Sequence, residues 1–349
     1  MVFSSVNVWY FSGTGNARFA ANHICDSVKG LGYTASSHSI INESFQKTNL
    51  DSNSLLGFCY PTHGFNAPPV VLKFLVSLPR GNSRFFLLNT RAGMKLSKVH
   101  TPGLGGVALW LPLLILLLKG FKPIGFRPLD MPSNWISLHP GIRTKVVISI
   151  KSHCTQTLNR FSRRIVSGRP VLNGLLWLPL DIAVAPVALV YYLFGRFFLA
   201  KTFFASYRCN GCGTCIKHCP VNAIVENDKR PYWTFRCESC MKCMNTCPQR
   251  AIETAHGFSF VFWWLGLSLM PTLLFRLLLR YSLISPDIYN EYRTLVDYVT
   301  EIALGFLVVF WGYRLLHWLL GFKLSNKLIT WLSPTHYKFW RRYFLDKEC

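Results

Sequence analysis

Eight cysteines in two matching groups constrain this chain more than any other feature. One group begins at Cys209 and the other at Cys237, and each reads Cys-x2-Cys-x2-Cys-x3-Cys-Pro. Three cysteines separated by two residues each can surround three corners of an iron–sulfur cube, and the fourth, followed by proline, can bind the neighbouring cube. The spacing therefore predicts two [4Fe–4S] clusters with crossed ligands. Cluster one would be held by Cys209, Cys212, Cys215 and Cys247, and cluster two by Cys237, Cys240, Cys243 and Cys219.

Zinc is the main alternative for clustered cysteines. It needs Cys-x2-Cys pairs separated by a longer stretch, and four closely spaced cysteines per group do not match that pattern. The other four cysteines are scattered without metal-ligand spacing. The first residues lack the basic start and the cleavage site of a secretory signal, so we expect the thiols to stay in a reducing cytoplasm.

Residues 208–254 resemble the bacterial two-cluster ferredoxin. Beyond the cysteines, each group is followed by Pro-x-x-Ala-Ile, at 220–224 and again at 248–252, which fits that family's internal repeat. The resemblance implies low-potential transfer of single electrons.

The first 167 residues alternate strand-like and helix-like stretches. Apolar runs at 6–11, 55–60, 84–89 and 124–126 read as strands, and the segments 17–31, 70–78, 107–118 and 143–166 read as helices. Such alternation predicts an α/β fold with a parallel, doubly wound sheet of five strands. The helix at 107–118 has no polar face, so we expect lipid or another apolar segment to cover it.

A loop of small residues, Ser12-Gly13-Thr14-Gly15-Asn16, follows the first strand at once. Backbone amides and small hydroxyls at a helix N-terminus can bind a phosphate, and no Gly-Lys-Ser/Thr follows as it would in a nucleotide-binding P-loop. The loop resembles the flavodoxin phosphate loop, Ser/Thr-x-Thr-Gly-Asn-Thr, except that Ala17 replaces the last threonine. The resemblance implies FMN, with these six residues around its phosphate.

Two later loops stand where a flavodoxin holds the flavin ring. Open parallel sheets bind ligands at the carboxyl ends of their strands, which favours both loops. Ordinary loop packing is the alternative for His63 and Phe65, and a solvated side chain is the alternative for Arg91. The predicted ring contacts are Pro61, Thr62, His63, Gly64 and Phe65 after the strand at 55–60, and Asn89, Thr90, Arg91, Ala92 and Gly93 after the strand at 84–89. No catalytic set of Ser, His and Asp stands out.

Residues 1–255 as a whole resemble the single-chain flavodoxin–ferredoxin fusion proteins of anaerobic microbes, including the stretch Met131-Pro132-Ser133-Asn134-Trp135. The expected organisation has four parts. Residues 1–167 form the flavodoxin-like FMN-binding domain, 168–205 an apolar linker, 206–256 the ferredoxin domain with two clusters, and 257–349 a transmembrane hairpin with a basic tail.

Membrane contact is indicated by composition, since half of the residues are apolar. The runs 258–279 and 303–322 have roughly spanning length, and the basic tail places both chain ends in the cytoplasm by the positive-inside bias. Helices packed on the protein are the alternative. A single crossing at 172–204 would separate the two cofactor domains, so we interpret that run as an interfacial or re-entrant helical hairpin.

These patterns predict an electron-transfer protein on the cell membrane, with FMN and two clusters facing the cytoplasm. The chain has 38 Lys and Arg against 15 Asp and Glu, so we expect acidic redox proteins and membrane lipid as partners, and no nucleic acid. An electron-supplying subunit of a membrane enzyme that reduces a lipid or quinone, and a redox sensor, are the alternatives. The donor, the acceptor and the direction of flow stay open.

Overall fold

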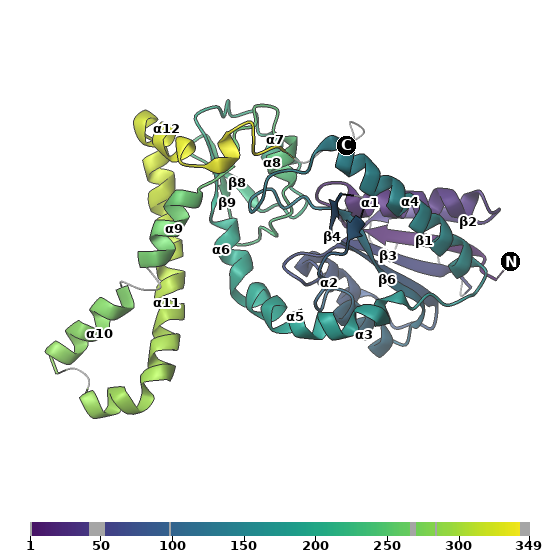
Figure 1. The fold of residues 1–349 in the computed structure, drawn as a ribbon, viewed down its shortest axis with the longest axis horizontal. Coiled ribbons are helices and arrows are strands. Elements are labelled where there is room, and N and C mark those ends of the chain that lie inside the picture. Colours follow the sequence, from purple (N-terminus) through teal and green to yellow (C-terminus); the bar gives the residue numbers. More distant parts are fainter. Residues whose placement is uncertain (1, 42–52, 98, 266–269, 283–284, 343–349) are drawn as a thin grey trace.

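The computed structural model describes all residues except 1, 42–52, 98, 266–269, 283–284 and 343–349. Its N-terminal part is a sheet with helices on both faces (Figure 1). Five strands run parallel in the order β2-β1-β3-β4-β6. This is the 2-1-3-4-5 order of flavodoxin-like doubly wound folds, so the predicted fold class is confirmed. The strands are β1 (Ser5–Tyr10), β2 (Thr34–Ser39), β3 (Leu55–Pro61), β4 (Arg84–Leu96) and β6 (Lys122–Pro132).

Two helical layers bury this sheet. Helices α1 (Asn16–Lys29) and α4 (Thr144–Val166) cover one face, and α2 (Pro69–Ser77) and α3 (Trp110–Leu118) cover the other. A parallel sheet that is covered on both faces needs strands that are apolar almost throughout, as β3 is. Packing is close enough that a Cβ on Gly57 would lie 2.2 Å from the Phe86 ring.

Helix α3 is apolar all round, and the described part of the chain covers only one side of it. Pro112, Leu113 and Leu116 are buried. Leu114, Leu117 and Leu118 are exposed. Lipid contact on this uncovered side stays a prediction.

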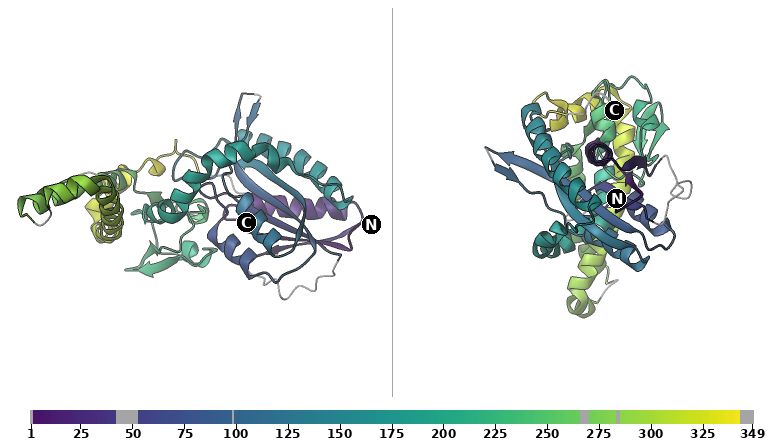
Figure 2. Two further views of the ribbon diagram at one scale, coloured as in Figure 1. Left: turned by 90° about the horizontal axis from the view of Figure 1, so that it is seen from below. Right: turned by 90° about the vertical axis from the view of Figure 1, so that its right-hand side faces the viewer.

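Strand β4 continues beyond the sheet. Its last residues, Met94 to Leu96, pair antiparallel with β5 (Val99–Thr101). The resulting hairpin projects from the domain (Figure 2).

The apolar linker is one continuous helical run, Asn173–Ala200, which we call the linker helix. It comprises η2 (Asn173–Trp177), α5 (Leu178–Val190), a π-helical turn η3 (Tyr191–Gly195) and α6 (Arg196–Ala200). The hairpin that we expected here is wrong. Pro179 stands in the first turn of α5, where proline is tolerated, and Pro186 lies inside the helix without reversing the chain.

The eight clustered cysteines lie in a small domain of short elements. Strand β7 (Phe203–Ala205), before the first group, pairs antiparallel with β10 (Ile252–Thr254), after the second. The elements between them are α7 (Thr214–Lys217), the hairpin β8 (Ile224–Asn227) and β9 (Arg230–Trp233), and α8 (Lys242–Thr246).

The last part of the chain is helical. Helix α10 and the first part of α11 extend away from the cysteine-rich and sheet domains (Figure 1). The end of α11 packs in the cysteine-rich domain through Tyr313, Leu316 and Leu320, and the Tyr313 hydroxyl accepts from the Trp233 amide at 3.1 Å. Within the described residues, two stretches are long and apolar enough to cross a membrane, the linker helix and Tyr298–Leu320. The second overlaps the predicted run 303–322, whereas the predicted run 258–279 includes residues outside the described part, so the transmembrane hairpin stays a prediction. The helices are α9 (His256–Trp264), α10 (Met270–Arg280), α11 (Pro286–Leu320) and α12 (Lys323–Trp331).

A C-terminal strap, residues 334–342, returns to both domains. The Arg341 Nε donates to the Gly141 carbonyl of the sheet domain at 2.8 Å. The Glu253 carboxylate, fully buried in the cysteine-rich domain, accepts from Arg342 at 3.1 Å and from Arg208 at 2.7 Å. A buried carboxylate needs such partners because burying an unpaired charge is costly.

Candidate cofactor sites

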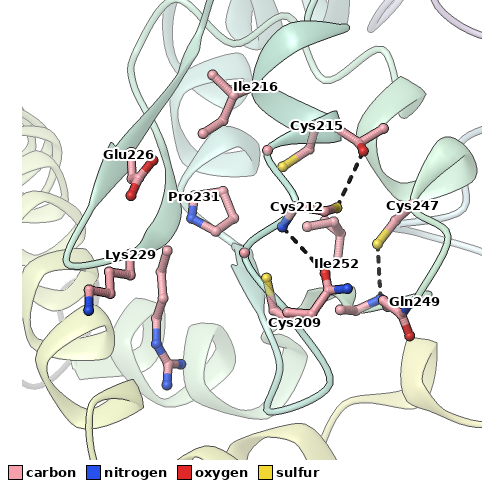
Figure 3. Close-up of a pocket in the computed structure, with 16 residues that line it drawn as sticks. Cys209, Cys212, Cys215, Ile216, Glu226, Lys229, Pro231, Cys247, Gln249 and Ile252 are labelled. Atoms are coloured by element: carbon pink, nitrogen blue, oxygen red, sulfur yellow. Dashed lines mark hydrogen bonds between the residues drawn. The ribbon is translucent and has the colours of Figure 1, made fainter.

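The first cysteine site combines residues from both groups. Cys209, Cys212, Cys215 and Cys247 line one pocket, and Figure 3 shows the four side chains around a common space. The loop can wrap around this space because Gly211 and Gly213 adopt left-handed φ angles of 72° and 67°. The structure therefore brings together the four ligands that the spacing predicts for cluster one.

The second site gathers Cys237, Cys240 and Cys243 with Cys219. Burial, with a smaller contribution from the nearby Cys219, raises the pKa of both Cys237 and Cys240 to about 12. Burial also raises the pKa of Cys243 well above its usual value, as do Cys237 and Cys240 beside it. Thiols this hard to ionise become thiolates near neutral pH only when a metal binds them.

The two sites have equivalent hydrogen bonds to sulfur. The Ala223 amide donates to the Cys219 sulfur at 3.2 Å, and the Ala251 amide donates to the Cys247 sulfur at 3.3 Å. Hydrogen bonds of this kind help set cluster potentials. In the described part of the chain, no three His, Cys, Asp or Glu side chains lie close enough together to bind one metal ion. The cysteines of each site are spaced more widely, as a cube requires, because each thiolate binds a different iron. The donor set and its amides fit iron–sulfur clusters.

A cavity of about 320 Å³, which we call the strand-end cavity, opens where β1, β3, β4 and β6 end. Twelve of the sixteen predicted FMN contacts line it: Ser12, Gly13, Thr14, Asn16, Ala17, Pro61, Thr62, His63, Phe65, Thr90, Arg91 and Ala92. Residues 132–135, in and after β6, line it as well.

The other four predicted contacts shape the surrounding backbone. Gly15 caps α1 with a φ of 94°, and Gly64 has a φ of 53°. The Asn89 side chain donates to the Thr62 hydroxyl at 3.0 Å. A Cβ on Gly93 would lie 2.7 Å from the Asp130 carbonyl oxygen, so β4 and β6 approach closely there.

The loop Ser12-Gly13-Thr14-Gly15-Asn16 is held in place by hydrogen bonds within itself and to residues at the end of β6. The Gly15 amide donates to the Ser12 hydroxyl at 3.1 Å. The Asn16 side chain donates to the Pro132 carbonyl at 2.9 Å, and the Asn134 side chain donates to the Thr14 hydroxyl. The sequence singled out Asn16 and Thr14 as phosphate ligands, but their side chains also fasten this loop to the end of β6.

Two basic side chains of the cavity, Arg91 and His63, are shielded from solvent, which removes the solvated alternative for Arg91 and leaves the packing alternative open for His63. Arg91 is not solvated: it is 3% exposed, its Nε pairs with Asp130 at 2.6 Å, and its guanidinium stacks on Trp177 at 3.9 Å. Burial lowers the pKa of His63 to about 4, so this imidazole is neutral at neutral pH. Among the described residues, His63 Nδ1 and Arg91 Nη1 are buried without a hydrogen-bond partner, which fits a polar ligand such as a flavin ring.

The second cysteine site and the strand-end cavity share a wall. We call residues 209–215 the outer loop and residues 237–243 the inner loop. Ser239 and Cys240 of the inner loop line the cavity, and a Cβ on Gly13 would lie 2.6 Å from the Cβ of Cys240. The Glu238 carboxylate accepts from the Val70 amide at the start of α2 at 2.9 Å. The spacing of the cysteines gave no signal for this contact, because the partners are more than 150 residues apart.

Residues 208–252 match the family model of the 4Fe-4S dicluster domain. This assigns the cysteine-rich part to an iron–sulfur domain. No match was found among curated protein sequences.

Several solved flavodoxins superpose on the sheet domain at low identity. Streptococcus pneumonia TIGR4 flavodoxin is 11% identical, with 46% of this chain and 97% of that chain covered and a TM-score of 0.31. A flavodoxin from the domain Archaea is 11% identical, with 46% and 99% covered and a TM-score of 0.30. Flavodoxin 1 from Bacillus cereus is 16% identical, with 46% and 98% covered and a TM-score of 0.30. The fold assignment rests on the strand order, not on these likenesses.

Proposed function

We propose that this protein transfers electrons between FMN in the strand-end cavity and two [4Fe–4S] clusters, one on each set of four cysteines. The observation that carries the proposal is the contact of Cys240 with Gly13, which makes a cluster ligand part of the FMN cavity wall. The order of electron carriers would be FMN, the inner-loop cluster and the outer-loop cluster. FMN supplies the exchange between two-electron and one-electron chemistry when it is bound.

The protein's own groups would hold and shield these cofactors. The amides at the start of α1 would bind the FMN phosphate, as helix N-termini bind anions. Phe65 and Trp135 would keep water from the ring. The unpartnered Arg91 Nη1 would donate to its polar edge, and His63 Nδ1 would donate to that edge or accept from it, depending on its tautomer. The eight thiolates would bind iron.

The outer-loop cluster would exchange electrons with a partner protein. Cys212 is exposed, whereas the inner loop is packed on the sheet domain. Lys229 and Arg230 line the pocket of the outer loop. Basic residues around an exposed redox centre would attract acidic redox proteins, because complementary charge raises the rate of encounter.

The protein would bind a membrane through the linker helix and α11. One side of the linker helix lies along the sheet domain: the Trp110 indole donates to Asp181 at 2.8 Å, and the Arg91 guanidinium stacks on Trp177. The helix could not cross a bilayer in this position without drawing that domain into lipid, which supports the interfacial interpretation. Apolar side chains on its other sides are exposed, among them Leu175, Leu176, Ile182, Leu189 and Val190. The stretch Tyr298–Leu320 would attach to the bilayer through its exposed side chains, among them Val299, Ile302, Leu307 and Trp311, with the cofactor domains facing the cytoplasm. Its end, from Tyr313 onward, packs in the cysteine-rich domain and would stay outside the lipid.

Anaerobic purification followed by metal, flavin and EPR analysis tests the proposal. About eight irons and one FMN are expected per chain, because two cubes hold four irons each. Reduced samples should give the EPR signals of two interacting clusters. A chain that contains zinc in place of iron, or that binds no flavin, would overturn the proposal.

A further inference from the structure

Lys201, the residue that follows the linker helix, has its charged end inside the protein. Only 7% of the residue is exposed. Its ammonium donates to the Trp233 carbonyl at 2.5 Å. The same nitrogen lies over aromatic rings, 4.3 Å from the centre of the Phe235 ring, 4.4 Å from that of Tyr313 and 4.7 Å from that of Tyr232. Lysine is almost never buried this deeply unless an opposite charge accompanies it.

A buried lysine usually pairs with a carboxylate. Among the described residues, no Asp or Glu side chain is within ion-pair distance of Lys201. Glu238, the acidic residue of the inner loop, accepts from the Val70 amide of the sheet domain instead, and Glu253 pairs with Arg208. The aromatic rings and the carbonyl offset part of the cost of burying the ammonium. They do not neutralise its charge, and an unpaired buried charge is costly.

Lys201 lies against the segment that leads into the inner loop. Its partner Trp233 and the ring of Phe235 come just before Cys237 in the sequence. The Cys237 amide donates to the Thr234 carbonyl at 3.1 Å, so a tight turn keeps this cysteine close to Trp233. Burial lowers the pKa of Lys201 to about 8, although the nearby Cys237 raises it, so the ammonium is charged at neutral pH. A fixed positive charge is therefore buried beside the inner cysteine site.

The cations beside the outer loop are exposed or paired. Lys229 is exposed and Arg230 is partly exposed, so solvent screens their charges. Arg208, which precedes Cys209, is neutralised by the buried Glu253 carboxylate at 2.7 Å. The two cysteine sites therefore differ in the charge that surrounds them.

We propose that Lys201 is the counter-ion of the inner-loop cluster and raises its reduction potential relative to that of the outer-loop cluster. A cube with four thiolate ligands is an anion, and it becomes more negative by one charge when it accepts an electron. A buried cation beside it stabilises the reduced form more than the oxidised form, because charges interact strongly where water is excluded. No bond forms or breaks, and the electron comes from FMN. The inference rests on the proposed function for the presence of the clusters.

A redox titration of the iron-loaded full chain, followed by EPR, tests the proposal. Lys201→Met keeps most of the side-chain length and removes the charge. It should make the inner cluster about tenfold harder to reduce, a fall of about 59 mV in potential for one electron. The outer cluster in the same sample should shift much less, and the Cys212→Ser background, which should keep only the inner cluster, assigns the signals. No shift of the inner cluster, or equal shifts of both clusters, would overturn the proposal.

Two matched variants separate the charge from the packing of the side chain. Lys201→Arg keeps the charge and should keep the inner cluster within about twofold of wild type in the same equilibrium. Lys217→Met removes the charge of an exposed lysine at the end of α7 and should have a similarly small effect, because solvent screens that charge. If Lys201→Arg lowers the potential as much as Lys201→Met, packing and not charge sets the potential, and the proposal fails.

The salt dependence of the shift provides a second measurement that needs only Lys201→Met. A buried charge is screened little by salt, so the difference in potential between wild type and Lys201→Met should be the same at low and high ionic strength. A difference that disappears at high salt would show that the charge acts from the surface, which contradicts the proposal.

Iron is measured on the same samples to keep the two proposals apart. Eight irons per chain with unchanged potentials in Lys201→Met would overturn only the role of Lys201, since two cubes hold about eight irons. A wild-type chain that takes up no iron would overturn the electron-transfer function and the role of Lys201 together.

Discussion

The outer and inner loops have the same cysteine spacing but different surroundings. In the outer loop the left-handed positions are Gly211 and Gly213, and no described atom lies within 4 Å of a Cβ built on Gly213. In the inner loop the equivalent positions are Ser239 and Met241, with φ of 51° and 62° and 2% exposure each.

This difference shows that one ligand pattern can be placed on two kinds of surface. A left-handed residue other than glycine costs about 1–2 kcal/mol. Burying a methionine side chain contributes about 1.5–3 kcal/mol, which offsets that cost at Met241. The inner loop therefore tolerates strained residues because their side chains are buried: Met241 packs in the apolar cluster of the cysteine-rich domain, and Ser239 lines the strand-end cavity. The outer loop keeps glycines and stays accessible to partners.

The largest expected effect comes from removing one cluster ligand in each loop. Cys240→Ser and Cys212→Ser should each lower iron from about eight to about four per chain. Only Cys240→Ser should stop electrons from reaching the remaining cluster from reduced FMN, because the inner cluster lies between them. Iron analysis and stopped-flow absorbance check this. Equal loss of transfer in both variants would remove the proposed distinction between the loops.

The crossed ligands give a second pair of variants, for which we expect effects as large as those of the first pair. Cys219 follows the outer loop in sequence but should hold the inner cluster, and Cys247 follows the inner loop but should hold the outer one. Cys219→Ser should therefore reproduce the transfer defect of Cys240→Ser, and Cys247→Ser should leave transfer from FMN to the inner cluster intact. EPR of the reduced variants identifies the surviving cluster. The opposite assignment would show that ligation does not cross.

Two carboxylates of the cysteine-rich domain should differ in their effect on stability: Glu253, which pairs with Arg208 and Arg342, and Glu238 of the inner loop, which faces the sheet domain. Glu253→Gln leaves Arg208 and Arg342 without a buried anion and should lower the free energy of unfolding by about 3–5 kcal/mol. Glu238→Gln removes one carboxylate from the N-terminus of α2 and should cost only about 1 kcal/mol. Denaturant unfolding of the iron-loaded protein measures both. If Glu238→Gln costs as much as Glu253→Gln, the contact between the inner loop and the sheet domain is far stronger than the hydrogen bond between Glu238 and the Val70 amide indicates.

Glycine-to-alanine changes compare the packing around the two loops. Gly13→Ala places a methyl group against Cys240 and should cost about 1–3 kcal/mol by overpacking, while slowing transfer from FMN. Gly213→Ala meets no described neighbour and should cost about 1 kcal/mol, from its left-handed backbone alone. Thermal unfolding and stopped-flow transfer are the measurements. Unchanged transfer in Gly13→Ala would show that the close approach is not needed.

The smallest effect is expected from surface charge at the outer loop. Lys229→Gln should slow oxidation of the reduced protein by ferricyanide, an anion, by about twofold at low salt. Oxidation by the cation hexaammineruthenium should not be slowed. Lys29→Gln, at the end of α1, is the control and should leave both rates unchanged. Equal rates in all three proteins would place the site of electron exit elsewhere.

Local patterns were sufficient to predict the sheet domain and the cysteine sites. The α/β alternation and the Cys-x2-Cys spacing are read within short windows, where propensity and ligand geometry act directly. The contact of Gly13 with Cys240 could not be predicted, because it joins segments that only tertiary packing brings together. The burial of Arg91, which removes the solvated alternative, could not be predicted for the same reason: its partners Asp130 and Trp177 come from β6 and from the linker helix.

The linker shows where reasoning from topology misled. A hairpin was expected because a single crossing would separate the two cofactor domains, but the run is one helix that packs along the sheet domain and includes both Pro179 and Pro186. That packing joins distant segments, so the linker sequence alone did not indicate it.

The C-terminal strap links the order of synthesis to the completion of the iron–sulfur domain. Arg342 leaves the ribosome 89 residues after Glu253, so the buried carboxylate waits for its second cation until the apolar helices have been translated. The domain should therefore stay open to incoming iron until the membrane segments have emerged. A chain that ends before Pro334 should accept iron as quickly as the full chain but lose it faster to a chelator.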